Sequence, residues 1–451
     1  MSTDSTQRCR TGSGEFDQEF GRLRRFGDDL MLEVSGVDAT TPAVEEWCLN
    51  GLEEVSVHQV VGDPLVDLTV VVPTWERQDF VLRQLRYWAP SAARLVVVDG
   101  SDLPLPCRVR EAIDGMERIT YRHERRPFHE RLVTAGSLVS TKYAVMLGDD
   151  EFHFPSGLRT VIHELEEESG LVGCMGQVLS FSPLDAYRRC LFSRVYRTLY
   201  EFDVCQTEPV DRLVAAMDPY TMATPYAVLR TAVWCRSWGS VGSYSSGVAA
   251  EMQQAMSVHL LGAFRTVATV QWLRSIENEI SAISDLEVEQ NRMIWFPEWW
   301  TKSCFSTERE SFVAGISEVV AEEIGMTAKE CSRGIVLGAE AFLEGSSEEW
   351  EHLDSSVGSA RTGSLSVERG VSAVGRRLPD PLGLALRRFR AVVLARMGSQ
   401  GGDYYGTSKD LPAQLRRDGV KLGPEFIDEV TAVEKLVSEF HELRRQEQAG
   451  A

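Results

Sequence analysis

The feature that constrains the fold of this chain most is an apolar run that ends in three consecutive acids. Residues 143–147 are apolar, and after Gly148 the sequence continues with Asp149, Asp150 and Glu151. A short, continuous apolar run that stops at polar residues is typical of a buried strand in a parallel sheet. Open α/β sheets bind their ligands beyond the carboxyl ends of their strands. The acids therefore mark a candidate ligand site at one edge of such a sheet.

Two interpretations of this acidic cluster remain open from these residues alone. Neighbouring carboxylates repel one another, and a hard divalent cation bound through oxygen atoms relieves that repulsion. Alternatively, the acids form a solvated turn, or the N-terminal turn of a helix that begins near Pro155. The residues around the cluster are needed to choose between these interpretations.

The chain before the cluster alternates between strand and helix patterns. A β-branched strand over 67–73 is followed by apolar residues at helical spacing over 80–88. Further strands are expected at 94–98 and 119–121, and a helical segment at 128–140. This alternation predicts βαβ units in a mostly parallel sheet flanked by helices. The polar residues that end these strands should converge on one edge of the sheet: Thr74, Arg77, Asp99, Ser101 and the acidic cluster.

The order of these motifs resembles the nucleotide-sugar glycosyltransferases of the A-type (GT-A, Rossmann-like) fold, in particular bacterial enzymes of family 2. The resemblance covers roughly residues 66–280 and depends on three motifs in order. They are Val72-Pro73-Thr74-x-x-Arg77, then Val97-Val98-Asp99-Gly100-Ser101, then the strand that leads into Asp149-Asp150-Glu151-Phe152. The family's central motif is usually Asp-x-Asp, and this chain has Glu151 as its third acid.

The resemblance implies transfer of a sugar, with inversion, from a nucleoside diphosphate donor of the UDP- or GDP-sugar type. The acceptor would be a hydroxyl group of a saccharide, a lipid-linked glycan or a natural product. A bound Mg²⁺ or Mn²⁺ suits this reaction because it neutralises the departing diphosphate. Mg²⁺ typically uses only one or two protein carboxylates. Asp150 and Glu151 are the expected metal pair, with Asp149 on ribose or sugar hydroxyls.

The resemblance also assigns a set of nucleotide-sugar-binding residues. Asp99 matches the aspartate that pairs with the nucleobase edge, although it could instead cap the turn that follows it. Arg77 and Arg131 match basic positions of the family, and Arg274 matches a basic residue that closes over the diphosphate. Pro73, Thr74, Ser101 and Asp149 complete the set. Three arginines near Arg131 are expected mainly to pair with surface acids: Arg122, Arg125 and Arg126.

An inverting transferase needs a general base for the acceptor hydroxyl, and the family places it about a hundred residues after the metal motif. Glu251, at the start of a helical segment that runs to Leu261, is the expected base. Its other interpretation is a first-turn glutamate that stabilises its helix through the dipole. Asp218, which precedes Pro219, is the competing candidate.

Composition restricts the class of protein. The formal net charge of −20 disfavours nucleic-acid binding, which requires clustered Lys and Arg. The nine cysteines show no Cys-x-x-Cys spacing, which favours a reducing, cytoplasmic location over a disulfide framework or a zinc site. No apolar run approaches the length of a transmembrane helix, and the N-terminus lacks the layout of a secretory signal.

The expected organisation has five parts. Residues 1–65 form a partly disordered lead-in, 66–280 the catalytic domain, 281–344 a helical extension, 345–375 a flexible linker or loop, and 376–451 a C-terminal helical region. The basic amphipathic segment that starts at Leu384 and ends at Met397 either packs among the C-terminal helices or touches an anionic membrane surface. These helices could also mediate homo-oligomer formation. If the linker is genuine, a chain truncated after about residue 375 should keep a folded catalytic unit.

Two other functions remain possible from the sequence. A nucleotidyltransferase has a similar sheet and similar carboxylates, but it usually carries a Gly-rich loop with a basic residue after its first strand. Pro73-Thr74-Trp75-Glu76 does not supply that loop. A non-catalytic scaffold or binding protein that retains the A-type fold is the other alternative, because Glu151 departs from the family motif.

Overall fold

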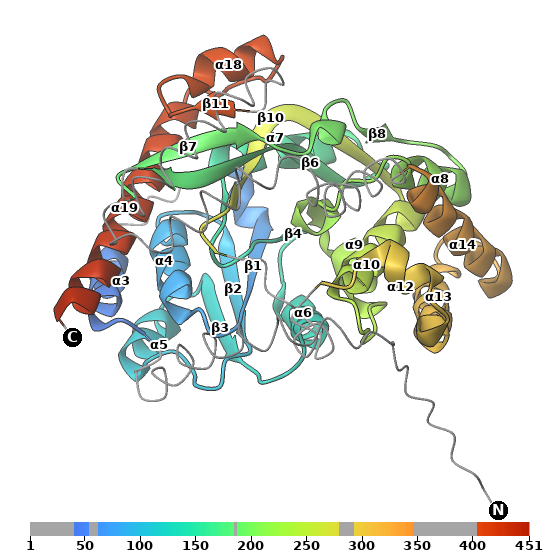
Figure 1. Cartoon of the computed structure of the whole chain (residues 1–451), viewed down its shortest axis with the longest axis horizontal. Coiled ribbons are helices and arrows are strands. Elements are labelled where there is room, and N and C mark those ends of the chain that lie inside the picture. The colour runs from blue at the N-terminus through green and yellow to red at the C-terminus, as the bar shows by residue number, and fades with distance from the viewer. Residues whose placement is uncertain (1–39, 54–61, 185–186, 279–292, 346–403, 451) are drawn as a thin grey trace, which may run out of the picture.

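The first half of the sheet is built as the alternating pattern predicts. The computed structural model describes residues 40–53, 62–184, 187–278, 293–345 and 404–450. Four parallel strands lie in the order β4-β1-β2-β3. Their bounds are β1 (Leu68–Thr74), β2 (Arg94–Asp99), β3 (Ile119–His123) and β4 (Tyr143–Met146). The helices α4 (Gln78–Trp88), α5 (Cys107–Asp114) and α6 (Phe128–Leu138) connect them (Figure 1).

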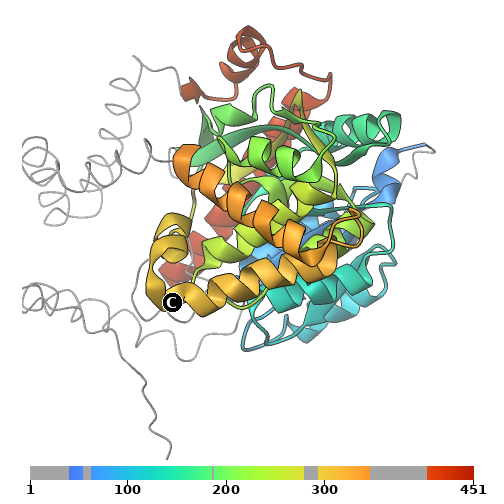
Figure 2. The ribbon, with the colours of Figure 1, turned by 90° about the vertical axis from the view of Figure 1, so that its right-hand side faces the viewer.

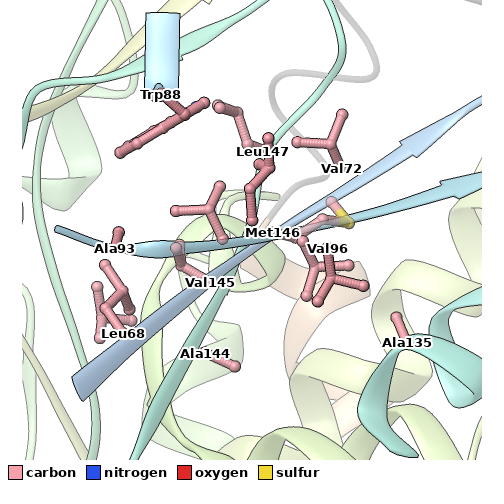
Figure 3. Packing of buried hydrophobic residues seen from close by; sticks show 14 of the residues in the cluster. Leu68, Val72, Trp88, Ala93, Val96, Ala135, Ala144, Val145, Met146 and Leu147 are labelled. Carbon is pink, nitrogen blue, oxygen red and sulfur yellow. The ribbon is translucent and has the colours of Figure 1, made fainter. Parts of the chain in front are cut away.

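The central strands of this half are apolar on both faces because helices cover both. Val72, Val96 and Met146 come from β1, β2 and β4 and are no more than 5% exposed. Figure 3 shows them packed in one cluster with Trp88 of α4. The parallel register pairs Thr74 with Asp99 at the ends of β1 and β2. The polar residues that follow these strands therefore start from one edge of the sheet.

The second half of the sheet is mainly antiparallel. β9 enters antiparallel between β4 and β6, and β7 and β11 extend this order beyond β6. β10 runs parallel to β6. The bounds are β5 (Phe152–His153), β6 (Leu171–Leu184), β7 (Arg189–Arg194), β8 (Asp203–Val204), β9 (Val228–Arg230), β10 (Ala263–Ser275) and β11 (Tyr404–Gly406). The α/β class is confirmed, and the sheet is mixed rather than mostly parallel because β5, β7, β8, β9 and β11 each pair antiparallel with a neighbour.

A helical layer covers one side of the second half of the sheet and has its own core, which includes Met252, Phe296, Trp299, Phe312 and Phe342. Figure 2 shows α13 and α14 outermost in this layer. The helices of this half are α7 (Pro155–Glu167), α8 (Pro209–Met217), α9 (Thr231–Gly239), α10 (Gly247–Leu261), α12 (Phe296–Thr301), α13 (Ser306–Val320) and α14 (Ala328–Gly345). Short 3₁₀ turns are η1 (Pro64–Asp67), η2 (Arg197–Leu199), η3 (Thr224–Tyr226) and η4 (Ser303–Phe305).

The C-terminal residues 404–450 pack on the same sheet as residues 62–278. β11 pairs with β7, and the helices α18 (Leu411–Arg417) and α19 (Phe426–Gly450) follow it. α19 crosses the first half of the molecule beside α3 (Pro42–Glu53) and α4 (Figure 1). Its Phe440 is fully buried, with its ring 5.0 Å from that of Phe80. α19 supplies part of the core, and the expectation that a truncation after about residue 375 leaves a folded unit does not agree with this packing.

Several expectations fall on parts of the chain outside the described residues. These are the disordered start, the linker beyond residue 345, and the basic segment 384–397. In the part of the chain that is described, none of the helices is both long enough and apolar enough to span a bilayer.

Candidate active site

Residues from three elements meet at the acidic turn between β4 and β5. At the end of β1, Thr74 donates its hydroxyl to Asp149 Oδ2 at 2.7 Å. Arg77 stands at the start of α4, with Nη1 3.4 Å from Asp149 Oδ1 and 3.7 Å from Asp150 Oδ2. Burial and the neighbouring charge of Asp150 raise the pKa of Asp149 to about 6, while Arg77 and Thr74 oppose the shift. The predicted convergence of Thr74, Arg77 and these two acids is present.

The backbone of the acidic turn is held from α4. The Gln84 amide donates to the carbonyl oxygens of Asp149 and Glu151, at 2.9 and 2.7 Å. Arg83 Nη2 donates to the Asp150 carbonyl at 2.9 Å. Both side chains are fully buried. Neither residue was predicted from the sequence. The pattern that could have indicated them is a pair of long polar residues between apolar Leu82 and Leu85, on a helix expected to pack on the sheet.

Asp99 caps the turn after β2. Its Oδ1 accepts the backbone N–H of Ser101 at 2.8 Å. Its Oδ2 accepts the Tyr121 hydroxyl at 2.7 Å and the Gln78 amide at 3.2 Å. The residue is fully buried, so a nucleobase edge could reach it only by displacing one of these donors. The capping interpretation left open by the sequence describes what Asp99 does here.

Ser101 and Pro73 shape the same edge. The Ser101 hydroxyl accepts the backbone N–H of Glu76 at 2.8 Å, which ties the loop after β2 to the loop after β1. Glu76 adopts a left-handed backbone with φ of 53°, a conformation rare for residues other than glycine. Pro73 is buried within β1 opposite Val98 of β2. These residues fix the loops that surround Thr74.

Arg131 lies beneath the ends of β1 and β2. Its Nη1 donates to the carbonyl oxygens of Thr74 and Val98, at 2.5 and 3.0 Å. Burial lowers its pKa, while the charges of Asp99 and Asp149 oppose that shift, so the guanidinium lies near both acids. Only 5% of the residue is exposed. Its observed role is to join two strand ends, and contact with a diphosphate stays a prediction.

The other three arginines of this region pair with surface acids, as expected. Arg122 contacts Glu124, Arg125 contacts Asp102, and Arg126 lies near Glu124 and Glu130. All three arginine side chains are more than half exposed.

Glu151 turns toward β10. Its Oε2 accepts the indole N–H of Trp272 at 3.1 Å. Burial, followed by the charge of Asp150, raises its pKa well above the ordinary value. In this structure Glu151 contacts Trp272, and its role as half of the metal pair stays a prediction.

Asp150 is the acid whose environment fits a metal ion. Its side chain is 14% exposed, and its Oδ2 accepts the Asn278 amide at 2.7 Å. Across the described ranges, no three residues among His, Cys, Asp and Glu are grouped as a metal site. One carboxylate together with substrate phosphates is nevertheless enough for Mg²⁺. A divalent ion would therefore be held by Asp150 and the donor rather than by an all-protein cage.

A second group of residues surrounds Arg274 of β10. The Arg274 guanidinium lies 5.5 Å from the Tyr196 ring, and its charge acts on both Glu151 and Glu251. The neighbouring Trp272 stacks on Tyr226 with ring centroids 3.9 Å apart and on Tyr196 at 5.8 Å. Because Trp272 also binds Glu151, this aromatic group adjoins the acidic turn.

Glu251 lies in the second turn of α10 and faces this aromatic group. The cap of α10 is Ser246, whose hydroxyl accepts the Ala249 N–H at 3.2 Å, so Glu251 is not a capping glutamate. Its Oε1 is out of reach of solvent and has no hydrogen-bond partner among the described residues. Burial raises its pKa to about 7, and the charge of Arg274 limits the shift.

Asp218, the competing base candidate, lies elsewhere. It is exposed at the end of α8, beside Gly345 at the end of α14. It makes no hydrogen bond or ion pair with the acidic turn or with Arg274 in the described part of the chain. Glu251, rather than Asp218, is brought to the site.

Comparison with known proteins yields only distant structural similarity. No protein-family model and no curated protein matches the chain. The crystal structure of S. aureus TarS 1-349 superposes with a TM-score of 0.37 at 9% identity, over 63% of this chain and 91% of that one. Its complex with UDP gives 0.36 at 9% identity over the same shares, and its complex with UDP-GlcNAc gives 0.35 at 10% over 63% and 92%. Similarity at this level assigns no residue of this chain.

Proposed function

We propose that this protein transfers a sugar from a nucleoside diphosphate sugar to a hydroxyl acceptor, with inversion and with a divalent metal ion. The observation that supports it best is the meeting of Thr74, Arg77, Asp149 and Asp150 at the carboxyl ends of β1 and β4. Such an edge is where open α/β sheets bind nucleotides. The Arg274 group adds a second set of charged residues beside the same turn.

On the donor side, Asp150 would hold Mn²⁺ or Mg²⁺ together with the diphosphate. When bound, that ion neutralises the charge of the departing nucleoside diphosphate. Arg77, which is 27% exposed, and Arg274 add guanidinium groups suited to phosphate oxygens. Asp149, which accepts the Thr74 hydroxyl, would also accept hydrogen bonds from ribose or sugar hydroxyls.

On the acceptor side, Glu251 would act as the general base. The acceptor oxygen attacks the anomeric carbon, the bond from that carbon to the diphosphate oxygen breaks, and the Glu251 carboxylate takes the hydroxyl proton. A pKa of about 7 matches this task, since a base works best when its pKa lies near the operating pH. Oε1 of this carboxylate has no competing hydrogen bond among the described residues.

The proposal is tested by thermal unfolding with UDP- and GDP-linked sugars in the presence of Mn²⁺. A ligand at a hundred times its Kd stabilises the folded state by about 2.7 kcal/mol, which appears as a higher Tm. We expect Asp150→Asn to abolish this shift, while Asp211→Asn, at an exposed position in the first turn of α8, keeps it. A Tm that no nucleotide sugar raises would reject the transferase and favour the scaffold alternative.

A further inference from the structure

A buried ion pair lies directly behind the acidic turn. Arg83 faces Glu277 with two hydrogen bonds, Nη1 to Oε1 at 3.1 Å and Nη2 to Oε2 at 2.9 Å. The exposed fractions of the two side chains are 0% and 1%. The same Arg83 Nη2 donates to the carbonyl oxygen of Asp150. The pair therefore continues into the backbone of the residue that we assign to the metal ion.

The C-terminal helix completes this pair. His441 of α19 forms a hydrogen bond through Nε2 with Glu277 Oε1 and stacks on Tyr187, with ring centroids 3.6 Å apart. The preceding residue, Phe440, places its ring centroid 4.8 Å from the Arg83 guanidinium carbon. α19 thus encloses the ion pair on the side away from the acidic turn and supplies one of its hydrogen bonds.

The charges of this network leave little freedom for rearrangement. Burial by itself would raise the pKa of Glu277, but Arg83 and His441 outweigh it and hold the pKa at about 2. Glu277 is therefore ionised at neutral pH and faces the Arg83 guanidinium. Removing one partner of a buried pair is strongly destabilising, because it leaves the other charge uncompensated. The guanidinium must stay where Glu277 holds it.

The side chain of Asp150 depends on the same segment. Asn278, the residue after Glu277, donates its amide to Asp150 Oδ2 at 2.7 Å. The Asp150 carbonyl is held by Arg83, and Arg83 is held by Glu277. Both the backbone and the carboxylate of Asp150 are consequently fixed by groups whose position depends on Glu277.

We infer that α19 is a positioning element of the active site, acting from His441 through Glu277 and Arg83 on Asp150. His441 is a positioning residue, not a catalytic one, because it touches none of the reacting groups. The effect of His441 on the structure of the acidic turn does not depend on the proposed function, whereas its effect on donor binding rests on that function. The consequence is that a residue close to the C-terminus controls the geometry of a turn almost three hundred positions earlier in the sequence.

The structural arm of the test is hydrogen exchange of the full chain, read on the peptide that covers residues 147–152. His441→Leu removes the hydrogen bond to Glu277, whereas His441→Gln keeps an amide donor at a similar reach. Glu439→Gln is the matched control, because Glu439 joins α19 to Trp47 of α3 and not to the ion pair. We expect exchange in this peptide to rise about tenfold in His441→Leu and to stay near wild type in the other two variants.

If His441→Leu does not fold, His441→Asn replaces it, since the shorter amide cannot reach Glu277. Unchanged exchange at 147–152 in the variant that loses the hydrogen bond overturns the inference. An equal rise in Glu439→Gln also overturns it, because that result would mean general loosening of α19.

The functional arm is a calorimetric titration with UDP and Mn²⁺. We expect His441→Leu to weaken binding about tenfold, equivalent to about 1.4 kcal/mol, and His441→Gln to restore it. Faster exchange at 147–152 in a protein that binds no nucleotide supports the positioning role and rejects the transferase. Normal exchange at 147–152 together with normal nucleotide binding in His441→Leu supports the transferase and rejects the positioning role.

Discussion

At the scale of the single residue, Glu251 combines burial, a missing hydrogen bond and a raised pKa. A carboxyl group whose pKa is higher in the folded than in the unfolded chain binds more protons when folded. Its contribution to stability is therefore fully present below its ordinary pKa of 4.5 and is lost as the pH rises through about 7. Above that pH, the chain holds a partly desolvated charge without a hydrogen-bond donor on Oε1. We interpret this loss of stability as the consequence of burying a carboxylate that serves as a general base.

Glu251→Gln should consequently stabilise the protein while abolishing sugar transfer. At pH 8 we expect the free energy of unfolding to rise by about 1–3 kcal/mol, because the neutral amide avoids the buried charge. Below pH 4.5 the variant and the wild type should be equally stable. Urea unfolding at both pH values provides the measurement, together with an assay of turnover.

Glu310→Gln is the control for this prediction, since Glu310 is exposed on α13 and should change stability at neither pH. Retained turnover in Glu251→Gln would exclude Glu251 as the base. A loss of stability at pH 8 would contradict the account of its pKa.

At the scale of the element, α19 acts as part of the core rather than as an appendage. Val430, Val433, Val437 and Phe440 are buried to 1% exposure or less against the sheet and α4. At its N-terminal end, Glu429 accepts hydrogen bonds from the backbone N–H and the hydroxyl of Ser156 in α7. The helix is amphipathic, so its apolar side needs a partner, and that partner is the first half of the molecule.

Deleting residues 404–451 should therefore destroy cooperative folding. The deletion exposes the apolar surface that α19 covers and leaves Arg83 and Glu277 without the His441 hydrogen bond. We expect a product that loses its near-ultraviolet circular dichroism and binds the dye ANS, as expanded states without fixed packing do. A long truncation that still unfolded cooperatively would show that α19 is dispensable.

At the scale of the whole molecule, buried titratable groups set the dependence of stability on pH. Burial lowers the pKa of His153 to about 4 and of His259 to about 3, and the ion pair keeps Glu277 at about 2. The unfolded chain binds more protons than the folded chain at each of these groups, so their stabilisation is lost as the pH falls. Asp149 and Glu251, with folded pKa values of about 6 and 7, and Glu151, whose pKa is also raised, have the opposite sign.

Between pH 4.5 and 6 the two histidines favour unfolding on acidification, and Asp149, Glu151 and Glu251 offset them by favouring folding. At lower pH this compensation ceases. Below pH 4.5 the histidines and Glu277 act in the same direction, and stability should fall by on the order of 2–4 kcal/mol per pH unit. Urea midpoints measured from pH 3 to pH 8 test this expectation. A steady decline that begins at pH 6.5 would contradict it.

Much of the site followed from local sequence because strand ends carry a local signal. An apolar run that stops at Thr74, Asp99 or Asp149 shows where each strand leaves the sheet, and parallel strands bring those ends together. The roles within the site were less predictable. Asp99 faces its own capping partners and Glu151 faces Trp272, and neither direction is encoded in the spacing of the motif.

The sequence alone determined the α/β class and the edge of the sheet at which the polar residues gather, whereas Glu251 was named only through the family resemblance. These follow from short-range patterns of burial, which repeat with the periods of strand and helix. Only the tertiary structure decided that β9 makes the sheet mixed and that α19 closes the core. It also decided that Asp150 is held by Arg83, Glu277 and His441. Those features depend on contacts between residues distant in sequence, and a buried ion pair leaves no periodic trace in the chain that forms it.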